Sequence, residues 1–244
     1  MKRLILLMIT CYCLLPGHAN TDIASDSLLQ VLQTLPHDTT RLSTLNDIIK
    51  IEQNNYKCIQ YSDTLMQEAL KLKNDKYASL AAYYHLLYYY NRSEQDSVAK
   101  WIVRMEPYVQ RSGLWDYFFD AQRFQIDLYT FTEQYELAIS EANKMKQKAL
   151  NTNSNRGTVA AYQCLSNAYI GSQRWDEGLK ALEEAYRLLP KKGNAVVHIS
   201  VLSQLISVTK EMKDNNRQLK YLQELESVLP VSYTHLRAHE TRSN

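Results

Sequence analysis

The chain has 244 residues, with 28 basic and 26 acidic side chains and a formal net charge of +2. Without residues 1–19 and 230–244 the counts fall to 24 basic and 25 acidic, so the positive charge belongs to the two ends. A central region with scattered charges of both signs excludes the basic surface that nucleic-acid-binding domains use. We therefore expect no nucleic acid as a partner.

Residues 1–19 have the three parts of a secretory signal peptide. Lys2 and Arg3 give a positive start, an apolar run follows, and Ala19 supplies the small residue at the cleavage site. The run is too short to cross a bilayer, which takes about 20 residues. A lipoprotein signal ending at Cys11 is the rival interpretation, but the residue before that cysteine is not small. We expect export to the periplasmic, extracytoplasmic side of a bacterial membrane.

Residues 20–38 are expected to form a leader and a capping helix. Asp26 and Ser27 can cap a helix that runs to about Leu35, and Pro36 ends it. Several leucines and a valine between these points give this helix one apolar side.

Residues 39–229 carry a repeat with a period of 40 residues. Units start near 39, 79, 119, 159 and 199, and they align without gaps on the equivalent positions Cys58, Val98, Ala138, Gly178 and Gln218. A fixed period between 20 and 50 residues is typical of stacked supersecondary units. Within each unit the apolar spacing predicts two helices, seen best in the fourth unit over 159–172 and 176–189. No run shows the period-two alternation of a strand.

The fourth unit resembles the tetratricopeptide repeat. It has large and small residues where that family places them, namely Tyr162, Leu165, Ala168, Tyr169, Trp175, Gly178, Leu182, Ala185 and Pro190. In the family's packing, a small residue at Gly178 lets the two helices of a unit approach each other, and Ala185 admits the next unit. The usual period is about 34 residues, so helices longer by about a turn are expected here. The resemblance implies an all-α, right-handed α-solenoid of about five helix-turn-helix units.

In that family the first helix of each unit lines the concave surface. The resemblance therefore implies a row of candidate binding residues, aromatic at one level and polar at the others: Tyr83, Leu87 and Tyr90 in the second unit, Arg123 and Asp127 in the third, and Gln163 and Asn167 in the fourth. Tyrosines suit an interface because they combine a large ring with a polar tip. We expect a protein or peptide partner. The family's clamp for peptide carboxylates is not expected. That clamp needs lysines, an arginine and asparagines at these positions, and only Asn167 matches.

Neither cysteines nor histidines point to catalysis or to a metal site. Cys58 and Cys164 fall in the first and fourth units, too far apart for a disulfide if units contact only their neighbours, so we expect two buried free thiols. His85 and His198 have no acidic or cysteine partner at ligand spacing. We expect no cofactor, no metal and no enzymatic activity in this chain.

Residues 231–241 resemble the translation of a sequencing-library transposase adapter. We therefore expect residues 230–244 to be an adapter-derived artefact and the native chain to continue differently after Leu229. A signal peptide followed by such an array resembles the periplasmic input region of membrane-bound bacterial signalling proteins, whose output is a histidine kinase or a helix-turn-helix regulator. This resemblance implies a membrane helix beyond Leu229 and allows a homodimer. A free-standing periplasmic or secreted adaptor is the alternative.

Overall fold

The computed structural model describes residues 18–52, 56–190 and 195–240, with side chains over 26–52, 56–190 and 195–229. These residues form eleven α-helices and no strand, which confirms the prediction of an all-α solenoid. The helices are α1 His18–Thr34, α2 Thr39–Glu52, α3 Lys57–Lys71, α4 Asp75–Tyr90, α5 Gln95–Ser112, α6 Trp115–Phe131, α7 Tyr135–Asn151, α8 Asn155–Gly171, α9 Trp175–Leu188, α10 Ala195–Glu211 and α11 Asn215–Glu240.

Ten of these helices form five pairs, and the helix starts follow the 40-residue period. The first helices α4, α6, α8 and α10 begin at 75, 115, 155 and 195, and the second helices α5, α7, α9 and α11 at 95, 135, 175 and 215. The unit starts expected near 79, 119, 159 and 199 therefore lie four residues inside the first helices. The expected starts followed the apolar positions, whereas the helices begin at polar caps such as Asn74 and Ser154, whose side chains accept the backbone N–H groups of Tyr77 and Gly157.

Most helices end in the same type of turn. A residue one to three positions after the helix end takes a left-handed backbone. These residues lie 20 positions apart up to Gln173, and position 193 lies outside the described residues. They are Lys73, Ser93, Gly113, Glu133, Asn153, Gln173 and Lys213. In six of these turns the next N–H then donates to the carbonyl five residues back, as from Asn74 to Ala69 (2.8 Å). This hydrogen bond satisfies a carbonyl that the helix end leaves free. The repeat thus has a half-period that the side chains alone do not show.

Helix α1 starts earlier than expected. It begins at His18, so the prediction that Asp26 and Ser27 cap it is wrong, and both lie inside the helix. No glycine or proline stands between His18 and Pro36 to interrupt helical hydrogen bonding. Residues 1–17 of the expected signal peptide, and 241–244 of the expected artefact, lie outside the described residues. Over 230–240 the backbone continues α11.

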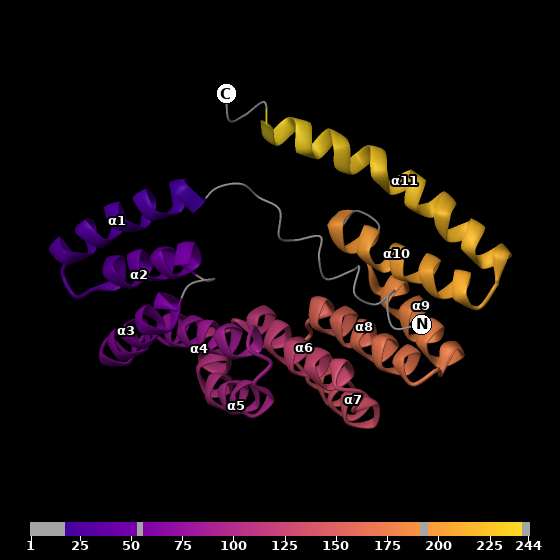
Figure 1. Cartoon of the computed structure of the whole chain (residues 1–244), viewed down its shortest axis with the longest axis horizontal. Coiled ribbons are helices and arrows are strands. Elements are labelled where there is room, and N and C mark those ends of the chain that lie inside the picture. The colour runs from indigo at the N-terminus through magenta and orange to yellow at the C-terminus, as the bar shows by residue number, and fades with distance from the viewer. Residues whose placement is uncertain (1–17, 53–55, 191–194, 241–244) are drawn as a thin grey trace.

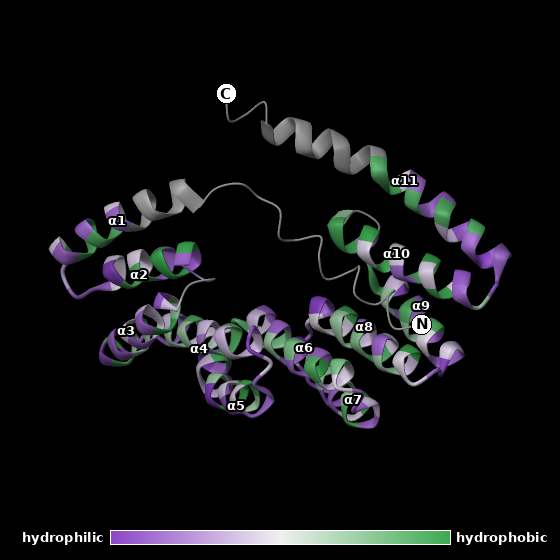
Figure 2. Cartoon of the chain, viewed as in Figure 1, coloured by the Kyte–Doolittle hydropathy of each residue, from purple (hydrophilic) through white to green (hydrophobic). Residues whose placement is uncertain are grey.

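The pairs stack into an arc with an inner and an outer layer (Figure 1). First helices touch across units, α2 with α4, α4 with α6 and α6 with α8, and no two second helices make comparable contact within the described residues. Helices α4, α6 and α8 line the inner side of the arc, and α5 and α7 lie on the outer side. Figure 2 shows hydrophobic and hydrophilic residues alternating around each ribbon, as expected for helices that bury one face.

The interior is filled by aliphatic, aromatic and alanine side chains. Phe118 and Phe119 are among the largest fully buried residues, and Cys58 and Cys164 are buried free thiols, as expected. Gly178 is a point of close approach: a Cβ there would lie 2.7 Å from Cγ1 of Ile170. This confirms that the small residue lets α9 pack tightly on α8.

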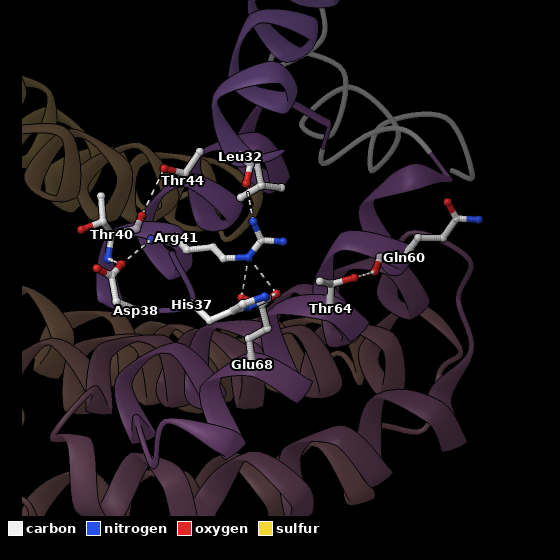
Figure 3. A network of polar contacts seen from close by, with 9 residues as sticks. All are labelled: Leu32, His37, Asp38, Thr40, Arg41, Thr44, Gln60, Thr64 and Glu68. Atoms are coloured by element: carbon white, nitrogen blue, oxygen red, sulfur yellow. Dashed lines mark hydrogen bonds and ion pairs between the residues drawn. The ribbon is translucent and has the colours of Figure 1, made fainter. Parts of the chain in front are cut away.

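A polar network fastens the first three helices together (Figure 3). Nε of Arg41, on α2, donates to both carboxylate oxygens of Glu68 on α3, at 2.9 and 3.0 Å. Its Nη1 donates to the carbonyl of Leu32 at the end of α1. His37 lies 3.5 Å from the same carboxylate, and Asp38 caps α2 by accepting the N–H of Thr40. Both charged partners are largely buried, so this network is structural.

Candidate partner-binding face

The predicted binding residues occupy the same two or three positions on three successive first helices. Tyr83, Leu87 and Tyr90 on α4 are half-buried, as are Arg123 and Asp127 on α6 and Gln163 on α8, while Asn167 is exposed. Since α4 contacts α6 and α6 contacts α8, these positions form one continuous inner face.

Aromatic rings of α4 and α6 meet at one place on this face. The ring of Tyr90 lies 4.5 Å from that of Phe124, and the ring of Tyr83 lies 6.4 Å from Phe124 and 5.0 Å from Tyr117. We call Tyr83, Tyr90, Tyr117 and Phe124 the aromatic patch. All four side chains are half-buried, so they pack on the core and still present ring surface.

Two of these rings were not among the predicted residues. Phe124 directly follows Arg123, and Tyr117 lies at the start of α6. The sequence carries one signal for Phe124, since it stands 40 residues after Tyr84, whose hydroxyl is buried against Asn46 of α2 (2.9 Å). The same register position therefore faces the neighbouring first helix in both units.

Arg123 lies between two carboxylates beside the patch. Its guanidinium nitrogens lie 3.9 Å from Asp120 and 3.8 Å from Asp127, and its guanidinium carbon lies 4.8 Å from the centre of the Phe124 ring. These distances allow attraction but exceed hydrogen-bond length. Among the described residues Arg123 donates no hydrogen bond, whereas Asp120 accepts one from Arg156 on α8 (2.9 Å).

Burial shifts the acid–base properties of the groups around Arg123. It raises the pKa of Asp127 to about 6, an effect that Arg123 reduces, and it raises the pKa of Asp120 against the opposing effect of Arg156. Burial also raises the pKa of Tyr83 to about 12 and that of Tyr90, each with a further increase from the nearer of the two aspartates. For both carboxylates the effect of burial on the pKa therefore outweighs the opposing effect of the neighbouring arginines.

The equivalent positions on α8 have a different chemistry. Gln163 donates from Nε2 to Oε1 of Gln204 on α10 (3.1 Å), and Asn167 points to solvent. Among the described residues, neither makes a ring or polar contact with the aromatic patch. Leu87, the remaining predicted residue, packs against the core. The structure thus gathers Tyr83, Tyr90, Arg123 and Asp127, and leaves Gln163 and Asn167 in a separate polar stretch.

His85 lies outside this face. It is almost fully buried between α3 and α5, its ring stacked on Trp101 at 4.0 Å, with Nε2 3.2 Å from Oδ1 of Asp63. Burial lowers its pKa, Asp63 raises it, and Arg104 lowers it further. His198 lies edge-on to Tyr186, with ring centres 6.4 Å apart. Across the described ranges no group of three or more histidine, cysteine or acidic side chains is arranged to hold a metal ion.

A wide hollow of about 630 Å³ runs along α7, on the outer layer. It is lined by Ser140, Asn143, Gln147 and neighbouring residues, and its two lysines are already paired, Lys144 with Glu141 and Lys148 with Glu106. It contains no aromatic residue and no perturbed acid. It is a weaker candidate than the inner face.

Comparison with known proteins identifies the fold and nothing finer. No family model matches the chain, and no curated protein does. The crystal structure of BtubC (BKLC) from P. vanneervenii superposes with a TM-score of 0.64 and 12% sequence identity, over 88% of this chain and 90% of that one. At this identity the likeness concerns the fold alone. None of the helices in the described part is long and apolar enough to span a bilayer.

Proposed function

We propose that this chain is an exported tetratricopeptide-type binding module that takes a peptide or a segment of a partner protein on its inner face. The observation that carries the proposal is the aromatic patch beside Arg123 and Asp127. Half-buried tyrosines on packed helices supply large contact area at little entropic cost, because packing already restricts their rotamers.

We further propose that the module is the input region of a bacterial signalling protein, with a histidine kinase or a helix-turn-helix regulator as its output. The charge and apolar pattern of residues 1–19 supports export, and the repeat supports a receptor role by analogy of architecture. A bound partner would change the curvature of the arc or the contacts of a dimer. No catalytic role is assigned to this chain.

The binding proposal is tested by panning a random peptide library displayed on phage against the purified chain. We expect peptides to be enriched on the wild type and lost on a Tyr83→Ala/Tyr90→Ala variant. A Gln163→Ala/Asn167→Ala variant is the matched control, because it alters the same face away from the patch, and it should enrich the same peptides. Equal enrichment on all three proteins would rule out the patch as the binding site.

The signalling proposal is tested by sequencing the source locus through the codon for Leu229 and beyond. A reading frame that continues into about 20 apolar residues and an output module supports it. An early stop codon would make the protein a free-standing adaptor. A native gene that encodes residues 231–244 would contradict the adapter interpretation.

A further inference from the structure

Acidic side chains outnumber basic ones around the aromatic patch. Asp116, Asp120 and Asp127 stand against Arg123 and Arg156, which leaves one negative charge in excess. Helix α4 adds no compensation, since it carries no acidic or basic residue after Lys76 apart from the buried His85. A partner of complementary charge for this part of the face is therefore basic.

One cationic group, the guanidinium of Arg123, already lies beside the aromatic patch. The guanidinium of Arg123 lies over the Phe124 ring and between two carboxylates, the arrangement that binds cations by charge and by the ring quadrupole. It is held loosely, with no hydrogen bond among the described residues and a side chain 39% exposed. A ligand cation could thus take hydrogen bonds that Arg123 leaves unmade.

We propose that the bound peptide presents an arginine or lysine side chain to Asp120 and Asp127, against the rings of Tyr90 and Phe124, and that Arg123 competes with it. This inference rests on the proposed function of the inner face. An acidic ligand group would reach Arg123 only beside two carboxylates, where repulsion opposes it. A second cation would instead lower the raised pKa values of these acids by stabilising their charged forms.

The test uses the peptides that the phage library yields. They should be rich in arginine or lysine, and one of them, synthesised with a fluorescent label, is titrated by anisotropy against the wild type and three variants. We expect Asp127→Asn to weaken binding by roughly fivefold or more, and Arg123→Gln to tighten it by roughly threefold. Asp47→Asn is the control, because Asp47 is an exposed carboxylate on α2, paired with Lys50 (2.9 Å), and it should leave binding unchanged.

A change on the ligand side keeps the test independent of protein folding. Replacing the peptide's arginine by citrulline, or its lysine by norleucine, removes the charge and should weaken binding to wild-type protein as much as Asp127→Asn does. Two outcomes would overturn this inference and leave the proposed function standing. One is that the peptides lost on the Tyr83→Ala/Tyr90→Ala variant contain no basic residues, and the other is that Arg123→Gln weakens binding. No face-dependent enrichment at all would overturn both.

Discussion

Helices α6 and α8 present the same register positions on the inner face, but α6 fills them with charged side chains and α8 with neutral amides. Arg123 and Asp127 on α6 correspond, 40 residues on, to Gln163 and Asn167 on α8. Each charged side chain has a neutral amide as its counterpart, on backbones whose helices begin 40 residues apart. The repeat therefore sets where a side chain lies, and the residue at that position sets what it can bind.

The consequences of this difference are electrostatic. On α6 the carboxylates lose water, and their pKa values rise. On α8 the side chain of Gln163 donates a hydrogen bond to Gln204, and Asn167 is exposed to solvent. Perturbed acids cluster at functional sites because function requires them where stability does not. Exchanging residues between equivalent positions of the two units tests which features belong to the scaffold and which to the site.

The largest expected effect is at the contact between the two helices of the fourth unit. The position filled by Val98 and Ala138 in earlier units is Gly178 here, and a Cβ would lie 2.7 Å from Ile170 and 3.3 Å from the carbonyl of Ser166. We expect Gly178→Val to lower the free energy of unfolding by about 3 kcal/mol, because the side chain overpacks the interface. Urea unfolding followed by circular dichroism measures it.

The third unit supplies the control for this substitution. Its counterpart of Ile170 is the smaller Thr130, and Ala138 already fits there. Adding Ile170→Thr to Gly178→Val should restore at least about 1 kcal/mol, since the two changes share one contact. Strictly additive losses would show that Ile170 is not what excludes a side chain at Gly178.

The second effect is a pH dependence that Asp127 brings to the third unit. Its folded-state pKa of about 6 lies above the ordinary aspartate value of 3.8, so its contribution to stability is complete below about pH 4 and is lost as pH rises through 6. We expect wild-type protein to lose about 1 to 2 kcal/mol between pH 4 and pH 6 relative to Asp127→Asn. Urea unfolding of both proteins at each pH measures it. Parallel pH profiles would contradict the shift.

A third effect of opposite sign comes from His85, whose counterpart on α8 is Leu165. The folded-state pKa of His85 is lowered, so the unfolded chain binds the proton more readily, and stability falls as pH drops below about 6.5. Asp63 on α3 and Arg104 on α5 face the ring with opposing charges. We expect His85→Leu to remove this loss of stability between pH 7 and pH 5. The measurement is the slope of the unfolding free energy against pH in urea unfolding. The lost stacking on Trp101 shifts this free energy equally at every pH and leaves the slope unchanged.

The sequence predicts the helix pairs well because each apolar position recurs every 40 residues. It predicts helix starts less well, since these depend on caps such as Asn74 and on the absence of a helix breaker before Pro36. Half of the site follows from register, as for Tyr83 and Tyr90. Register points to Phe124 only through its counterpart Tyr84, which is buried against α2, so the sequence does not mark Phe124 as a ring on the inner face.

The smallest effect concerns the turns, where the two units should behave alike. Glu133 after α6 and Gln173 after α8 both have a left-handed backbone, with φ of 61° and 65°, a conformation that glycine adopts at Gly113 (φ 76°). This conformation costs a residue with a Cβ roughly 1 kcal/mol relative to glycine. The greater conformational freedom of glycine in the unfolded chain offsets part of that difference.

We therefore expect Glu133→Gly and Gln173→Gly each to raise the free energy of unfolding by about 0.5 kcal/mol, and Gly113→Ala to lower it by about 1 kcal/mol. The alanine result isolates the backbone, because a Cβ at 113 meets no atom within 4 Å. Equal gains at 133 and 173 would show that the two units share their turn energetics even though their inner faces differ. Unequal gains would mean that the charge at this turn matters, since Glu133→Gly also removes an acid just beyond the C-terminus of α6 while Gln173→Gly removes none.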